Sequence, residues 1–382
     1  MTPPTRWPQH PRPLEGEALS SWLARLAGCY SMSLRCLLDW AMEGIDVNED
    51  DLDLGPSPAL LRTLTQRTGV PPETLSRMSL IGWTPWLTDS LEAELAAFDT
   101  YVNQFSVMLA PGRRPPRTVA DWRAWIPSNP LTRACPGCLE DPSRQGLLLV
   151  WKLPLLLSCP EHGFLLEPCI GARGNFVILT TSDPQCGSIS APVRAMERLT
   201  WQALTHGCVE LPRRTVHAGT WFRLLRTIID ELSGPLSEWG NRSADLKRLW
   251  GECNLPLRGG LTRWQPFEDV PWEHQANLLM GAAQAVDALT SGQMAGRGTS
   301  AHLFLPEPEG PVDDGTPPRT TALRDAVAKL NRITTAALGN PKTAQALYDL
   351  AAKAIRDRPL IDLRPSGFPV AGVEGDGTGS CG

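Results

Sequence analysis

The stretch from residue 135 to residue 163 constrains the chain most, because it contains two closely spaced pairs of metal-ligand residues. It reads CPGC, then a leucine-rich run, then CPEHG. Cys135 and Cys138 form the first pair, and Cys159 and His162 form the second, each with two residues between its members. Three thiols and one imidazole in this spacing are typical of tetrahedral structural zinc sites. The sequence therefore predicts one zinc ion that joins two tight turns.

Other interpretations of these cysteines are weaker. Cysteine is common in protein cores, but two pairs of equal spacing in one short stretch are hard to obtain by chance. A catalytic zinc would need an open position for water, and here all four tetrahedral positions would be filled. A zinc deaminase would need an H-x-E upstream of P-C-x-x-C. The only upstream histidine is His10, followed by Pro11, and Ala134 stands where that proline would be.

The segment between the two pairs, residues 146–158, reads GLLLVWKLPLLLS. It is shorter than the roughly 20 residues of a membrane-spanning helix, and Lys152 and Pro154 interrupt it. We expect extended chain from one pair to the other. No run of about 18 apolar residues occurs elsewhere, and the first residues carry no apolar signal segment. These features predict a soluble, cytoplasmic protein without membrane contact.

Composition limits the class of protein. The 382 residues, 42% hydrophobic and 20% charged, are enough for about two or three globular domains. The 36 lysines and arginines against 41 aspartates and glutamates give a net charge of −5, so any contact with nucleic acid needs a local basic face. Ten cysteines in a chain this long are too dilute for a secreted disulfide scaffold. We expect a mainly α protein with a small zinc-binding ribbon or knuckle module.

The first 110 residues read as a helical domain. Apolar residues recur at helical spacing over residues 19–30, and Ser33 is suited to cap a second helix over residues 34–41. An acidic loop at residues 48–53 follows, which we interpret as a solvated connector.

Residues 58–80 have the order of a helix-turn-helix motif, with a helix, a turn at Gly69 and a second short helix. The second helix would present Glu73, Thr74 and Arg77 outward, as candidates for contact with DNA. An ordinary helical hairpin has the same pattern, and the sequence leaves both interpretations open.

A basic strip begins at Pro111. Residues 111–133 hold five arginines against one aspartate, a local charge of +4, and such a strip could bind phosphates or stack on bases. The alternative is a proline-stiffened linker in which Trp122 and Trp125 pack on the zinc module. We favour packing for the tryptophans and leave the role of the arginines open. The arginines considered as DNA contacts are Arg113, Arg114 and Arg117.

Helical patterns return in the second half of the chain. Helices are expected within residues 89–109, 191–232, 272–289 and 320–357. Six arginines against two glutamates in residues 194–226 form a second basic area, of charge +4. The predicted division is a helical domain with the helix-turn-helix segment (1–110), a basic linker with the zinc module (111–190), a C-terminal helical domain (191–364) and a disordered tail (365–382).

Signatures of common enzymes are absent from the sequence. It has no G-x-x-x-x-G-K-[ST] phosphate loop, no G-x-G-x-x-G after a strand, no G-x-S-x-G elbow and no H-E-x-x-H. Scattered acidic residues show no spacing that points to a metal-binding carboxylate cluster. The sequence therefore favours a binding and scaffolding protein over an enzyme.

Two stretches together resemble the TniQ/TnsD family. PRPLEGEALSSWLARLA near the start is similar to the family's P-x-x-x-E-S-x-x-S-W-x-x-R-x-A opening, and CPGCLED…W…CPEHGFLLEPC is similar to its zinc-binding centre. The resemblance covers about the first 170 residues. The matching positions are Pro13, Glu17, Leu19, Ser21, Trp22, Arg25, Leu26 and Ala27, then Cys135, Cys138, Leu139, Trp151, Cys159, His162, Gly163 and Leu166.

One position departs from the family pattern. The family often has a further C-P-x-C after the HG, and here Cys169 is followed by Ala172 at the place of the second cysteine. We therefore expect one structural zinc site and no second one, unless Cys186 substitutes. Otherwise Cys169 and Cys186 are expected to be buried free thiols.

The resemblance implies a transposon target-selection factor that is not itself catalytic. Such a factor recognises target DNA, directly or through a CRISPR effector complex, and recruits an AAA+ ATPase regulator that delivers the transposase. The family also implies helical surfaces for partners, which can include a second copy of the chain. The alternative is a zinc-containing DNA-binding transcriptional regulator.

Overall fold

The computed structural model describes residues 6–42, 45–141, 144–172, 175–178, 189–305, 327–329, 331–336, 339–340, 342 and 344–345. Most of the helix predicted over residues 320–357 and the tail predicted over residues 365–382 lie outside these ranges. The described part is mostly helical, with small antiparallel sheets and a group of three cysteines and one histidine in the central region. The expected mainly α fold is confirmed.

Short helices form the N-terminal unit, residues 7–78. Ser33 Oγ accepts a hydrogen bond from Cys36 N at the start of the second helix, as expected. Ser57 Oγ does the same for Leu60 N, and the helix that begins there ends at Gly69, whose φ is 74°. The helices are α1 (Leu19–Cys29), α2 (Leu34–Ala41), α3 (Pro58–Thr68) and α4 (Pro72–Arg77), with the 3-10 turn η1 (Glu49–Asp51) between α2 and α3.

The chain after the N-terminal unit is less helical than its pattern predicts. The helix expected within residues 89–109 is reduced to α5 (Ala97–Val102), preceded by the 3-10 turn η2 (Leu80–Trp83). Tertiary contacts replace helical bonds here, because Val107 N and Met108 N donate to the buried carboxylate of Glu231 at 3.0 and 2.7 Å. In the interior of a helix, both amides would instead donate to carbonyls four residues earlier.

The central module, residues 133–178, is a small sheet beside two short helical turns. Strands pair in the order β1-β2-β3, with Ala134 opposite Glu167 and Cys169 opposite Ile178. The leucine-rich segment is not extended throughout, since it contains a 3-10 turn that buries Trp151. The elements are β1 (Arg133–Ala134), α6 (Pro136–Glu140), η4 (Leu149–Lys152), β2 (Glu167–Ala172) and β3 (Asn175–Ile178).

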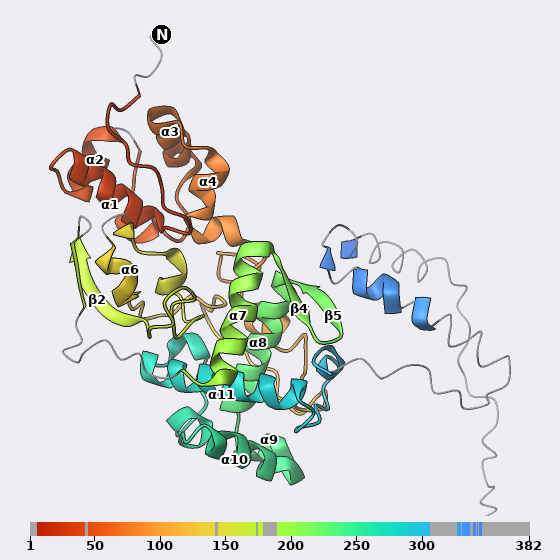
Figure 1. Ribbon diagram of the computed structural model, residues 1–382. Helices are drawn as coiled ribbons and strands as arrows, with labels where there is room; N and C mark the ends of the chain where they lie inside the picture. Colours follow the sequence, from red (N-terminus) through yellow and green to blue (C-terminus); the bar gives the residue numbers. More distant parts are fainter. Residues whose placement is uncertain are drawn as a thin grey trace, which may run out of the picture.

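Longer helices build the C-terminal part of the described chain (Figure 1). The helical pattern over residues 191–232 is interrupted by a hairpin that the sequence reading missed, in which Val209 pairs with Val216. The elements are α7 (Ala191–His206), β4 (Cys208–Leu211), β5 (Arg214–His217), α8 (Ala218–Ser233), α9 (Leu236–Trp239), η5 (Gly240–Arg242), α10 (Ser243–Glu252), η6 (Leu257–Gly260), η7 (Phe267–Asp269), α11 (Trp272–Thr290) and η8 (Ala301–Leu303).

Buried apolar side chains fall into two clusters. One lies within the N-terminal unit, and the other holds Ala18 and residues from Leu80 to Phe304, with α8 buried along its whole length. The clusters therefore divide the chain near residue 79, whereas composition placed a domain boundary at residue 110. The predicted domain limits stay predictions. Among the described residues, no helix has the length and apolar character that crossing a bilayer requires.

Candidate metal centre

Two tight turns bring the four predicted ligands together. Cys135 precedes α6 and Cys138 lies in its first turn, where Leu139 N donates to the Cys135 carbonyl at 3.1 Å. Cys159 and His162 lie in a turn closed by Gly163 N donating to the Cys159 carbonyl at 2.8 Å. In the described chain these four residues form the only group of three or more His, Cys, Asp or Glu residues arranged to hold a metal ion.

The distances within this cysteine–histidine cluster fit zinc. A tetrahedral ion with Zn–S bonds of about 2.3 Å and a Zn–N bond of about 2.0 Å would separate two sulfurs by about 3.8 Å and a sulfur from the nitrogen by about 3.5 Å. The Sγ atoms of Cys138 and Cys159 are 3.7 Å apart. His162 Nδ1 lies 3.5, 3.3 and 3.6 Å from the sulfurs of Cys135, Cys138 and Cys159. The cluster could therefore bind zinc with Nδ1 as the histidine ligand.

Hydrogen bonds among the sulfurs decide which thiol ionises first. The Cys135 thiol donates to the sulfur of Cys159, which lowers the pKa of Cys159 to about 5 and raises the pKa of Cys135. Burial raises the pKa of Cys138 to about 12. Three sulfurs this close ionise together only when a cation compensates their charge, and a bound metal ion deprotonates its thiol ligands.

The surroundings fix the shape of the cluster. A Cβ on Gly137 would lie 3.0 Å from the ring of His162 and 3.1 Å from Phe164, so a side chain there would displace the imidazole. The rings of His162 and Phe164 are stacked, with centroids 6.2 Å apart. Arg144 and Glu161 form an exposed ion pair nearby in sequence. Close contact at Gly137 is a requirement that the C-x-x-C spacing alone did not reveal.

Buried polar groups hold the central module against the C-terminal helices. Arg133 is fully buried, donates to the carbonyls of Leu153 and Leu156 at 2.7 and 2.8 Å, and lies over the ring of Trp272. Glu197 on α7 accepts from the backbone of Leu157 and Ser158, and its burial raises its pKa. Arg133 lies two residues before Cys135, and the two residues that donate to Glu197 come directly before Cys159, so these contacts position both turns.

Cys169 is buried on β2 and is not part of the cluster. Burial raises the pKa of its thiol, which suits a core thiol rather than a ligand. Cys186 lies outside the described residues, so the suggestion that it forms a second site stays a prediction.

The two stretches that carry the family resemblance meet in space. Glu17 forms an ion pair with Arg25 at 2.7 Å and accepts from Ser21 Oγ at 3.1 Å. Ser21 Oγ in turn accepts from Leu147 N at 2.9 Å, and Ala18 N donates to the Leu147 carbonyl. The polar residues of the first stretch therefore join α1 to the segment that links the two ligand pairs.

A second contact between these parts was not predicted. Lys152 of η4 forms an ion pair with Asp53 and donates to Ser20 Oγ, while Ser20 N donates to the Asp53 carboxylate. Asp53 belongs to the acidic segment that the sequence predicts to be a solvated connector. A local reading of the sequence contains no signal that would pair it with a lysine of the central module.

The candidate DNA contacts of the helix-turn-helix segment are on the surface. Glu73, Thr74 and Arg77 are exposed on α4, while Leu75 and Met78 are buried beneath them. This agrees with the predicted outward and inward faces. Whether α4 contacts DNA stays a prediction.

The basic strip is for the most part not available to phosphate. Arg113 is exposed, but Arg114 is buried in an ion pair with Asp230 at 3.1 Å. Arg117 pairs with Asp230 and with Glu238. Acidic residues more than 100 positions away along the chain therefore neutralise two of the three arginines considered as DNA contacts, and we withdraw these two as candidates.

The tryptophans of the strip pack, as favoured, but on other elements. Trp122 Nε1 donates to the buried carboxylate of Glu268 at 2.7 Å, and Trp125 Nε1 donates to the Tyr101 hydroxyl at 3.1 Å. Trp125 also makes an edge contact with Phe267. They join α5 to η7 and do not cover the cysteine–histidine cluster.

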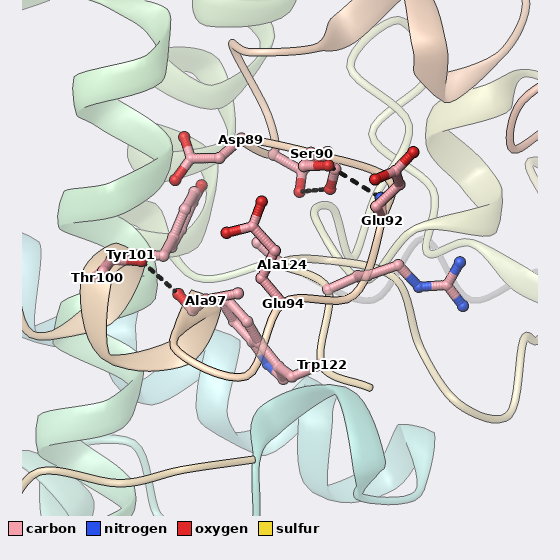
Figure 2. Close-up of a pocket in the computed structure, with 11 residues that line it drawn as sticks. Asp89, Ser90, Glu92, Glu94, Ala97, Thr100, Tyr101, Trp122 and Ala124 are labelled. Carbon is pink, nitrogen blue, oxygen red and sulfur yellow. Dashed lines mark hydrogen bonds between the residues drawn. The ribbon is translucent and has the colours of Figure 1, made fainter. Parts of the chain in front are cut away.

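An acidic pocket lies beside α5 (Figure 2). Asp89, Glu92 and Glu94 line it together with Tyr101 and Trp122. Asp89 forms an ion pair with Arg223, and the Tyr101 hydroxyl donates to the Leu87 carbonyl, so these polar atoms have partners within the protein. Its acidic lining does not suit an anionic ligand.

Comparison with known families identifies the N-terminal part of the chain. Residues 8–166 match the TniQ family, and the chain therefore carries a TniQ family domain over these residues. TniQ proteins are associated with transposition and are generally non-catalytic. No curated protein matches the chain, and no solved structure does.

Proposed function

We propose that this protein is a non-catalytic adaptor in DNA transposition, which selects or marks the target site and recruits an AAA+ ATPase regulator and a transposase. The observation that carries the proposal is the TniQ domain over residues 8–166. The matching positions of both stretches lie inside it, and the stretches contact each other where Leu147 N donates to Ser21 Oγ and where Glu17 pairs with Leu148. The transposition-associated role belongs to the family, and the recruiting step is our proposal for this chain.

Zinc has a structural role in this proposal. Cys135, Cys138, Cys159 and His162 would fill all four positions of a tetrahedral ion, which leaves none for a reacting water. The ion would supply a fixed link between two turns, to which α1 is joined through Leu147. The N-terminal unit would then be held in one orientation for a partner.

The exposed face of α4 is the proposed contact for target DNA or for a CRISPR effector complex bound to it. Glu73, Thr74 and Arg77 would provide this contact. Because α4 has only six residues, it would contribute few base contacts, and recognition would need further surfaces. A second copy of the chain could provide one of them.

Association with the ATPase is the direct test. The full chain and its Glu73→Ala/Arg77→Ala variant would be used to capture the AAA+ ATPase encoded beside it, with and without target DNA. We expect the wild-type chain to capture the ATPase in at least one condition, and the variant to lose the DNA-dependent part. Failure under both conditions would contradict the proposal. Specific promoter binding without any ATPase association would support a transcriptional regulator instead.

A further inference from the structure

The tip of the β4–β5 hairpin carries two adjacent arginines. Residues 212–213 form its turn, because the strand register pairs Leu211 with Arg214. Gln202 Oε1 accepts a hydrogen bond from Glu210 N at 3.3 Å, so the hairpin lies along the last turns of α7. Figure 1 shows the hairpin beside α7 and α8. The two arginines are therefore presented by a rigid element.

These arginines lack acidic partners in the described part of the chain. Neither Arg213 nor Arg214 has a carboxylate oxygen within ion-pair distance there, and the buried Nε of Arg214 has no hydrogen-bond partner. Arg223 and Arg226, from the same basic area of the sequence, each form an ion pair with a carboxylate. Both side chains are partly exposed, and no carboxylate of the described chain offsets their charge, so the pair can attract an anion from solvent.

The positive charge of Arg213 and Arg214 also affects His302 of η8. Its Nδ1 lies 2.9 Å from the carbonyl of Thr299 and must carry the proton, because a carbonyl only accepts. Burial lowers the pKa of His302, and the guanidinium groups of Arg214 and Arg213 lower it further. The positive charge at the hairpin tip therefore disfavours protonation of a histidine on a neighbouring element, and no carboxylate of the described residues offsets this effect.

We propose that Arg213 and Arg214 bind backbone phosphates of the DNA on which the protein acts. The proposal rests on the proposed function in transposition, since that function supplies the DNA. Planar guanidinium groups bind phosphate through paired N–H donors. Arg194 and Arg198, one helical turn apart and exposed on α7, likewise form no ion pair in the described chain and extend the basic surface. Contact with backbone phosphates positions a protein without reading sequence.

The test compares two double variants of the full chain. Arg213→Gln/Arg214→Gln removes the proposed contacts, and Lys247→Gln/Arg248→Gln removes the same charge from the exposed face of α10. Affinity for a short mixed-sequence DNA duplex would be measured at several salt concentrations. Each lost phosphate contact lowers the slope of log affinity against log salt by about 0.9. We expect the hairpin variant to bind more weakly with a slope lower by about 1 to 2, and the α10 variant to bind like wild type.

Equal slopes for the hairpin variant and wild type would overturn the inference, as would equal losses in the two variants. If both variants have the Tm of the wild-type chain, the loss of binding does not come from unfolding. Capture of the ATPase without DNA should be unchanged in the hairpin variant. If capture is lost while the salt slope is kept, the arginines bind an acidic protein surface and the DNA assignment is wrong. Failure of this inference with ATPase capture intact would leave the proposed function standing.

Discussion

Gly137 shows how a single residue can determine the metal centre. It lies between two cysteine ligands, and a Cβ there would make tight contacts of 3.0 Å with the imidazole of His162 and 3.1 Å with the ring of Phe164. The spacing of the ligands could be read from the sequence, since both pairs are local. The need for glycine could not, because it arises from the second turn folding onto the first.

Replacing Gly137 with alanine should therefore weaken metal binding. The added Cβ would lie 3.0 Å from the ring of His162 and would force the imidazole to shift, and changes in residues that orient a metal ligand typically alter affinity by about 10–100-fold. Zinc affinity would be measured by competition with a chromophoric chelator. Gly251→Ala is the matched control, since a Cβ on Gly251 in α10 meets nothing within 4 Å. Equal affinities for the two variants would contradict the predicted contact.

Glu231 is a second residue whose role depends on distant contacts. It is fully buried, accepts from Val107 N and Met108 N, and has Arg114 Nε at 3.9 Å. Burial raises its pKa to about 7, and Arg114 opposes that rise in part. The sequence could not reveal this site, because the interacting groups lie more than 100 residues apart.

The raised pKa of Glu231 predicts a pH dependence of stability. Between its ordinary pKa of 4.5 and about 7, the folded protein binds a proton that the unfolded chain has lost, so stability falls as pH rises through this range. Glu231→Gln removes the titrating carboxyl group, so the variant lacks this pH dependence. We expect the unfolding free energy of wild type, relative to the variant, to fall by up to about 3 kcal/mol between pH 4.5 and pH 7.5. Urea denaturation at a series of pH values would measure it, and parallel curves would contradict the assignment.

At the scale of elements, local patterns predicted some structures and missed others. α1 and α11 follow from the periodicity of their apolar residues, and α3 follows from periodicity together with its Ser57 cap. The β4–β5 hairpin lies between two strong helical patterns, and the sequence does not predict it. A signal was present, because Val209, Leu211 and Val216 alternate with exposed residues as in a half-buried strand. Its turn has no glycine or asparagine that would have marked it.

The junction between α1 and the central module should be sensitive to its buried ion pair. Glu17 is fully buried and Arg25 is 19% exposed. Glu17→Ala would leave the guanidinium and Ser21 Oγ without their acceptor, at a cost of about 2–4 kcal/mol. Hydrogen exchange should also become faster at Leu147, whose amide donates to Ser21.

A surface ion pair of α2 provides the control for this change. Arg35 and Asp39 are 63% and 58% exposed, so Asp39→Ala should change stability by no more than about 0.5 kcal/mol. Chemical denaturation would compare both variants with wild type. Similar small losses in both would mean that the Glu17 contact does not join the two parts.

At the scale of the molecule, the three cysteines of the cysteine–histidine cluster belong to the larger of two apolar cores. The N-terminal unit buries its own side chains, and the C-terminal helices bury theirs with most of the central module. Glu197 and the contact of Arg133 with Trp272 connect the central module to the C-terminal helices, and Lys152 connects it to the N-terminal unit. Such buried polar contacts fix relative orientation more than they add stability, which suits an adaptor whose surfaces must be presented in register.

The whole arrangement was only partly visible in the sequence. Local ligand pairs and the family resemblance identified the central module, because both depend on residues close together in the chain. Arg114 and Arg117 form ion pairs with carboxylates more than 100 residues away along the chain. The sequence therefore shows a continuous basic strip, whereas in the folded protein Arg114 and Arg117 are largely buried in ion pairs and Arg113 stays exposed.

Metal content tests the central claim most directly, namely that one zinc ion joins the two turns. The purified full chain and the Cys138→Ser and Cys159→Ser variants would be analysed for bound zinc and for folding of the central module. We expect one zinc per wild-type chain, and little or none in either variant, with loss of protected amides around Trp151 because structural zinc contributes to folding directly. A wild-type chain that folds without metal, or a variant that keeps one zinc per chain, would contradict the account.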